Sequence, residues 1–137
     1  MSNSRLARAA NVAESTAHAR VTALIEAGFI RGFRADVDLS LLGASIEALI
    51  LVKVRPESRV RLRDEAERLA ACPGVLEVLF LGGQYDLAVK VAVADPAQLR
   101  DFVMNELSRH PEIAGTETCL VLEDLIGTRP PGLEPTS

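Results

Sequence analysis

The chain is poor in aromatic residues, with no tryptophan, one tyrosine and four phenylalanines among 137 residues. Its hydrophobic content is nevertheless 48%, so its core has to be built from aliphatic side chains. Together with a charged fraction of 25%, this hydrophobic content is typical of a soluble globular protein and not of a disordered one. The length suits one ordinary domain, or a small domain beside a compact one.

Long hydrophobic segments are also missing. The longest uninterrupted apolar run, Ala48 to Val52, has the length of a strand and not of a membrane span. No charged segment followed by a signal-type apolar stretch is present. These absences predict a cytoplasmic protein that has no membrane partner.

Cysteine and histidine are scarce, with two residues of each. Cys72 and Cys119 lack the spacing of metal ligands, and we interpret them as two small buried thiols. His18 and His110 are far apart, and neither forms a Cys/His or Ser/His pattern. Catalysis requires a paired base or nucleophile or a metal cluster, so the sequence predicts no enzyme, no metal site and no cofactor. The fold class inferred below also occurs in enzymes, and therefore does not by itself decide the matter.

Charge is distributed unevenly along the chain. Residues 1–35 contain five arginines and two glutamates, a net charge of +3, whereas the rest contains ten basic and seventeen acidic residues, a net charge of −7. A small basic segment joined to an acidic body favours contact with nucleic acid at one end. From the charge alone, five arginines on a solvated surface without any partner are an equally good explanation.

The basic segment has the pattern of two short helices. A helical stretch from Arg5 to Ala10 is followed by Asn11-Val12 and by a second stretch from about Glu14 to Ala27, which Gly28 ends. Two helices in this order are what a DNA-reading helix-turn-helix requires. The inward face of the second helix is apolar: Ala17, Val21, Leu24 and Ile25.

We identify five candidate DNA contacts: Ser15, Thr16, Arg20, Arg31 and Arg34. Short polar side chains at the start of a recognition helix reach base edges or phosphates, and arginines near it contact phosphates. For Ser15 and Thr16 the alternative is that they serve only the helix N-terminus. For Arg20 the alternative is a solvated or salt-bridged side chain.

The rest of the chain predicts an α+β fold with the order β-α-β-β-α-β, a ferredoxin-like unit. Its antiparallel sheet is expected to carry both helices on one face. The strands are predicted at residues 45–55, 75–81, 85–93 and 113–122, and the helices at 58–71 and 96–109. The first helix is expected to turn Leu62, Ala66, Leu69 and Ala70 inward.

Apolar side chains occupy both faces of the first two strands, whichever face points inward. Soluble monomers rarely leave such a patch uncovered. We therefore predict that a second copy of the chain covers the face without helices and forms a two-fold dimer.

Residues Leu6 to Asp124 together resemble the Lrp/AsnC (feast/famine) transcriptional regulators. The resemblance rests on Gly28-Phe29-Ile30 and neighbouring positions, on Gly83-Gln84-Tyr85-Asp86, and on Thr116-Glu117-Thr118. In that family a winged helix-turn-helix precedes a ferredoxin-like βαββαβ effector domain of the RAM type. The resemblance implies promoter DNA as a partner, a homodimer that often assembles into octamers, and a small effector, usually an amino acid.

Two departures from the family pattern concern the DNA-binding part. The family has another helix before the two present here, so the resemblance predicts a partial helix-turn-helix. Ala13 stands where the family prefers a capping serine, and an alanine cap costs about 1 kcal/mol. The alternative function is accordingly a stand-alone amino-acid-sensing oligomerisation module that has lost autonomous DNA binding.

The candidate effector residues are Gly83, Tyr85, Asp86, Thr116 and Thr118. The Asp86 carboxylate is suited to an ammonium group, and the backbone at Gly83 to a carboxylate. Each has a simpler alternative: a turn-capping aspartate, a turn glycine, a tyrosine at a dimer seam, or β-branched residues that favour a strand.

The predicted organisation has four parts. Residues 1–35 form the partial helix-turn-helix, 36–44 a linker, 45–125 the effector-binding and dimerisation domain, and 126–137 a flexible tail.

Overall fold

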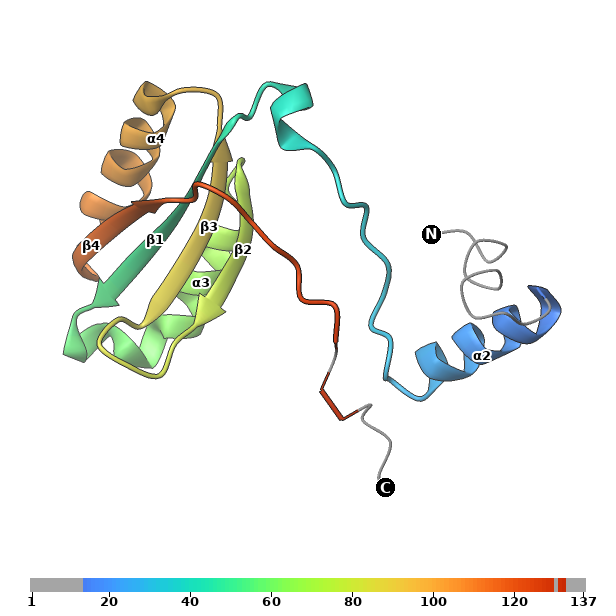
Figure 1. Cartoon of the computed structure of the whole chain (residues 1–137). Helices are drawn as coiled ribbons and strands as arrows, with labels where there is room; N and C mark the ends of the chain where they lie inside the picture. Colours follow the sequence, from blue (N-terminus) through green and yellow to red (C-terminus); the bar gives the residue numbers. More distant parts are fainter. Residues whose placement is uncertain (1–13, 130, 133–137) are drawn as a thin grey trace. The chain divides into compact units, whose positions relative to one another are not determined.

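The computed structural model describes residues 14–129, 131 and 132, and it divides the chain into two compact units, before and after the boundary between Val37 and Asp38 (Figure 1). The predicted helix Arg5 to Ala10, the Asn11-Val12 turn and the Ala13 cap lie outside the described residues.

The first unit contains the predicted second helix, α2, which runs from Glu14 to Glu26. Ala17 and Val21 are its buried residues, 3% and 8% exposed. They are four positions apart and therefore lie on one side of the helix. Leu24 and Ile25, which we also expected to face inward, are 42% and 45% exposed in this chain.

The second unit is built on a four-stranded antiparallel sheet with the order β2-β3-β1-β4. The strands are β1 (Ile46–Val54), β2 (Val75–Phe80), β3 (Leu87–Val93) and β4 (Ile113–Leu120). The two longest pairings bring β1 to the centre, between β3 and β4. This is the strand order of the predicted ferredoxin-like unit, and it makes β2 and β4 the edge strands.

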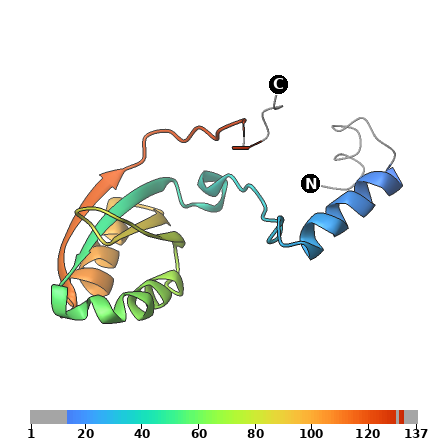
Figure 2. The ribbon, with the colours of Figure 1, turned by 90° about the horizontal axis from the view of Figure 1, so that it is seen from below.

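Two helical segments cover one face of this sheet (Figures 1 and 2). The first comprises the 3₁₀ segment η2 (Pro56–Arg61) and α3 (Leu62–Ala70). The second comprises α4 (Pro96–Phe102) and the π-helical η3 (Val103–Ser108). They enclose an aliphatic core, in which fully burying a leucine stabilises the fold by about 1.5–3 kcal/mol. The largest fully buried side chains are Ile50, Leu69, Leu87, Leu107, Val52, Val54, Val89 and Val91.

Side-chain caps and a left-handed glycine mark two of these boundaries. Asp95 accepts a hydrogen bond from the backbone N–H of Gln98 at 2.8 Å, and Pro96 follows at the first helical position. Asp38 caps the 3₁₀ turn η1 (Leu39–Leu42), which ends at Gly43 with a left-handed φ of 86°. Both are the capping geometries that these residue types favour.

The predicted inward stripe of α3 requires a correction. The helix begins at Leu62 and not at Ser58, and its buried residues are Glu65, Ala66 and Leu69. Ala70, one residue or about 100° beyond Leu69, is exposed. A charged side chain, Glu65, takes the inward position that the apolar pattern left unassigned.

Cys119 is also not the buried thiol that we expected. It is exposed, whereas Cys72 is half-buried. Cys119 lies on the edge strand β4 opposite Leu49 of β1, on the face that carries no helix. A position inside a strand therefore did not imply burial.

The chain after β4 continues along the sheet without forming a helix or strand up to Gly127. The N–H of Val121 donates to the carbonyl of Glu47 at 2.9 Å, and Asp124 forms an ion pair with Lys90 of β3 at 3.6 Å. Among the residues described, none belongs to a helix with the length and hydropathy needed to span a membrane.

Candidate nucleic-acid interface and effector site

The polar side of α2 is open to solvent. Ser15, Thr16 and Arg20 are all exposed, whereas Ala17 and Val21 are buried. Successive helical residues are about 100° apart, so Thr16 and Arg20, four positions apart, share one side of the helix, with Ser15 about 100° from Thr16. This is the orientation that base edges or phosphates would require of them.

A C-capping motif at Gly28 ends α2. Gly28 adopts a left-handed φ of 84°, its N–H donates to the Ile25 carbonyl at 3.1 Å, and the Phe29 N–H donates to the Leu24 carbonyl at 2.9 Å. This pair of bonds satisfies two carbonyls at the helix end. Replacing Gly28 by a residue with a Cβ would strain the backbone at this position.

Arg31 and Arg34 follow this motif in a segment without regular structure, and both are exposed. The five predicted DNA contacts therefore lie in the same unit, all of them exposed. Their contact with DNA stays a prediction.

Asp86 is the most firmly held of the predicted effector residues. It is 9% exposed, and its Oδ2 accepts a hydrogen bond from the Val54 N–H at 2.8 Å. Its Oδ1 lies 3.5 Å from Nε of Arg59 in η2. Asp86 thus connects the start of β3 to the end of β1 and to η2, through partners that are distant in sequence. Binding of an ammonium group by Asp86 stays a prediction.

Tyr85 reaches across the sheet to β4. Its hydroxyl donates to Oε2 of Glu117 at 2.8 Å. This hydrogen bond to Glu117, with a smaller effect of desolvation, raises the pKa of Tyr85 above its ordinary value. The pair joins two segments that the sequence analysis considered separately.

The register of β4 assigns the two threonines to the other face of the sheet. Thr116 is paired with Val52 and Thr118 with Ile50, whereas Glu117 between them is paired with Leu51. Directly paired residues share a face. Thr116 and Thr118 therefore point to the side of the buried Val52 and Ile50, and Glu117 points to the open side.

The structure thus brings together only part of the predicted effector set. Tyr85 and Asp86 are adjacent to the exposed Gly83 in the β2–β3 connection, while both threonines project from the opposite face of β4. Two side-chain partners were not predicted, Glu117 for Tyr85 and Arg59 for Asp86. Alternation along 116–118 was visible in the sequence, but the face of each residue depends on pairing with β1.

Two family models match the chain, one in each of its two units. A model of winged helix-turn-helix DNA-binding domains matches residues 1–31, and a model described as the Lrp/AsnC ligand binding domain matches residues 47–131.

Relatives and solved structures give the same assignment. The transcriptional regulator AldR of Mycolicibacterium smegmatis is 38% identical over 128 residues, covering 93% of this chain and 75% of the relative. The crystal structure of AldR of Mycobacterium tuberculosis matches at 32% identity with a TM-score of 0.69, covering 95% of this chain and 88% of that one. A transcriptional regulator of Neisseria meningitidis in complex with L-Met matches at 22% identity with a TM-score of 0.76, covering 93% and 82%, and shows the shared fold.

These relatives are transcriptional regulators of a non-enzymatic family, which confirms the prediction that the chain is not an enzyme. The matched domains and relatives show that the chain belongs to the Lrp/AsnC family of transcriptional regulators, with a DNA-binding helix-turn-helix and a ligand-binding domain.

Proposed function

We propose that this regulator recognises specific DNA through α2 and that an amino acid, bound to its βαββαβ unit, modulates that recognition. The exposure of Ser15, Thr16 and Arg20 on α2, beside the buried Ala17 and Val21, is the observation that carries the proposal. Arg31 and Arg34 add positive charge just beyond the helix, where phosphates would be contacted.

The effector part of the proposal is supported by the connection between β2 and β3. Gly83 is exposed, and a Cβ added there would meet no heavy atom of the described residues within 4 Å. No side chain at Gly83 obstructs the approach of a ligand to the backbone of this turn. The Tyr85–Glu117 pair next to it offers a hydroxyl and a carboxylate for the ammonium end. The regulator of the same fold from Neisseria meningitidis was solved with L-Met.

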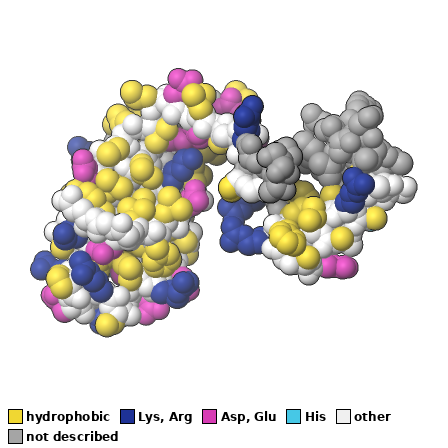
Figure 3. Space-filling view, turned by 60° about the horizontal axis from the view of Figure 1, so that its bottom comes forward, with side chains coloured by type: hydrophobic (Ala, Val, Ile, Leu, Met, Phe, Trp, Pro, Cys, Tyr) yellow, Lys and Arg dark blue, Asp and Glu magenta, His cyan; other side chains and the backbone are white. Residues whose placement is uncertain are grey.

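A dimer is the third element of the proposal. The helix-free face of the sheet presents Leu49 and Leu51 of β1, which are half-buried, and Leu79 of β2, which is 42% exposed. Figure 3 shows hydrophobic side chains gathered over the middle of the second unit, with charged groups nearer its margins. A second copy placed against this face would remove the apolar surface from water; assembly of dimers into an octamer is the larger form of the same proposal.

Gel-shift titration of the chain against its own upstream promoter region tests DNA recognition. We expect Arg20→Ala to weaken binding and to reduce the slope of log K against log salt by about 1, because one phosphate contact is lost. Arg100 is an exposed arginine of α4, and Arg100→Ala is the matched control. It should leave the DNA affinity and its salt dependence unchanged. Equal binding by the Arg20 variant and the parent at every salt concentration would refute phosphate contact by Arg20.

Calorimetric titration with a panel of amino acids tests the effector. We expect heat from at least one of them, and loss of that heat in Glu117→Gln if the ammonium group is bound there. Amino-acid binding without any DNA binding would favour the stand-alone sensing module. No heat from any amino acid would leave a dimer module without this class of effector.

A further inference from the structure

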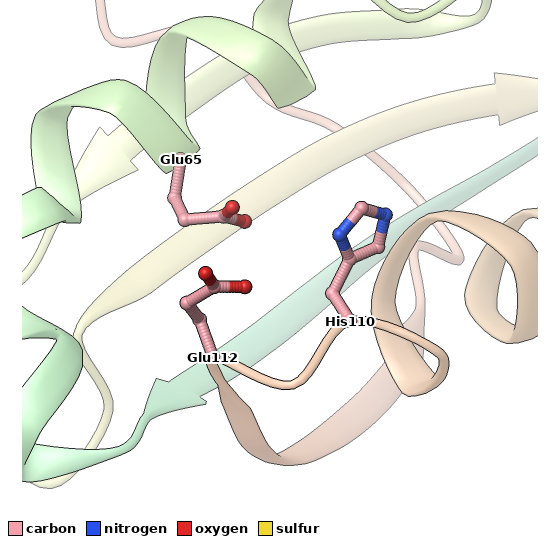
Figure 4. Close-up of side chains that lie close together, drawn as sticks. All are labelled: Glu65, His110 and Glu112. Carbon is pink, nitrogen blue, oxygen red and sulfur yellow. The ribbon is translucent and has the colours of Figure 1, made fainter.

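Three side chains with metal-binding atoms meet at one end of the βαββαβ unit. They are Glu65 of α3, His110 just after η3, and Glu112 just before β4. One ligand atom from each lies within 4.8 Å of the other two. Figure 4 shows the two carboxylates turned toward each other with the imidazole beside them.

The backbone that carries two of these side chains is held firmly. The N–H of Arg55 donates to the Glu112 carbonyl at 2.8 Å, and its Nε donates to the Pro111 carbonyl at 2.7 Å. The Ile113 N–H closes the turn by donating to the His110 carbonyl at 3.1 Å. The positions of His110 and Glu112 are therefore set before any ligand arrives, which reduces the entropic cost of binding.

Glu65 is held from the other side. Its carboxylate is contacted by Arg68, with Nη2 at 2.9 Å from Oε2 and Nε at 3.4 Å from Oε1. Burial opposes the charge of Arg68, but its hydrogen bond to Glu65 and the nearby acidic groups outweigh this effect and raise the pKa of Arg68. Arg68 also contacts Glu106 at 3.2 Å, so its charge is shared between two carboxylates.

The carboxylates of the cluster already have arginine partners. Glu65 lies 2.9 Å from Arg68, which also contacts Glu106, and Glu112 lies 3.7 Å from Arg61. The Arg55 guanidinium at the Pro111 carbonyl is a third positive group at this turn, so a bound cation has to replace these contacts. Two carboxylates this close, one of them 8% exposed, are stabilised by any cation placed between them.

We propose that Glu65, His110 and Glu112 bind a divalent transition-metal ion, with Zn²⁺ as the best match. One imidazole and two carboxylates form a three-ligand set that suits Zn²⁺ and leaves a position for water. Bonds of about 2.0–2.2 Å to one ion require the ligand atoms to move closer together than 4.8 Å. Side-chain rotations supply that movement, because the backbone of the turn is already in place.

The site links two segments that are distant in sequence. Glu65 belongs to α3, and His110 and Glu112 flank the turn between η3 and β4. A bound ion would therefore tie the two helical segments of this unit together at one end of the sheet. Because the folded chain binds the ion and the unfolded chain lacks the site, metal should raise the midpoint of thermal unfolding.

Calorimetric titration of the metal-stripped, tag-free full chain with zinc chloride tests the proposal. We expect one equivalent per chain, an upward shift of the thermal midpoint, and at least about tenfold weaker binding in His110→Ala. Glu112→Gln should weaken binding as well. His18→Ala is the matched control, since His18 is the only other histidine and lies on α2; it should leave binding unchanged.

The cysteines are the competing ligands for zinc. A Cys72→Ser, Cys119→Ser double variant should bind as the parent does, and cobalt substitution should show no thiolate charge-transfer band. Circular dichroism checks that each variant is folded. Stoichiometric binding that survives His110→Ala, or binding that disappears with the cysteines, would overturn the proposal. So would a parent chain that binds no zinc, which would leave a hydrogen-bonded His–carboxylate cluster.

Discussion

Asp86 illustrates how much a single buried carboxylate can depend on partners that are distant in sequence. Val54 donates to it from 32 residues earlier in the chain, and Arg59 lies within ion-pair distance. The hydrogen bond to Val54 is the more important contact, because the side chain of Arg59 is 54% exposed and such ion pairs are screened by water.

We expect Asp86→Asn to destabilise the chain by about 1–3 kcal/mol, because a buried backbone donor would lose its charged acceptor. Urea unfolding followed by circular dichroism measures the change. Asp101→Asn, at an exposed position of α4, serves as control and should stay within about 0.5 kcal/mol of the parent. Equal stability of the two variants would refute a structural role for Asp86.

Tyr85 provides a direct readout at the same scale, because it is the only tyrosine and the chain has no tryptophan. Its hydrogen bond to Glu117 stabilises the neutral phenol, so its pKa should lie above the ordinary value of about 10. Absorbance of the phenolate during alkaline titration measures it, and Glu117→Gln should lower the midpoint. The stabilisation is present at neutral pH and is lost as the pH rises through the pKa of the folded state. An unchanged midpoint in the variant would contradict the contact.

At the scale of elements, the start of α4 depends on one local bond. Asp95 accepts from the Gln98 N–H at 2.8 Å, and Gln98 in return accepts from the Ala94 N–H at 3.0 Å. We expect Asp95→Ala to cost about 1 kcal/mol, since it removes the N-cap acceptor. Chemical unfolding of this variant beside Asp101→Ala, on the same helix, isolates the cap. A loss no greater than in Asp101→Ala would show that the cap contributes little.

At the scale of the whole molecule, the helix-free face of the sheet governs assembly. We expect the parent to elute as a dimer or a multiple of it, and Leu51→Lys to shift the population toward monomer, because a charge would be buried in the interface. Light scattering after size exclusion measures the mass. Val60→Lys is the control, since Val60 is 91% exposed in η2, and it should assemble as the parent does. A stable parent monomer would refute the dimer.

Features that depend on contacts within a few residues could be predicted from the sequence, and features that depend on distant contacts could not. The end of α2 at Gly28 and the start of α4 at residue 96 are decided within one helical turn, and local residue types indicated them. The inward position of Glu65 and the exposure of Cys119 were not predicted. Each depends on what packs against the residue, and neither periodicity nor hydropathy contains that information.

The two candidate sites also differ in how far the sequence could predict them. Ser15, Thr16 and Arg20 could be assigned to one helix, because a helical pattern follows from residue spacing alone. The effector residues could not be assigned to a common face. Pairing of Thr116 with Val52 depends on the register of β4, and a shift of one residue would exchange the faces.

The sequence by itself determined the family and the order of the elements, because these follow from motifs and from local patterns of residue types. Only the tertiary structure decided that Tyr85 meets Glu117, that Asp86 supports the end of β1, and that Glu65 lies beside His110 and Glu112. Such meetings join residues 32 or more positions apart. They depend on strand register and on how the helices pack on the sheet, and these are set by the burial of the whole core.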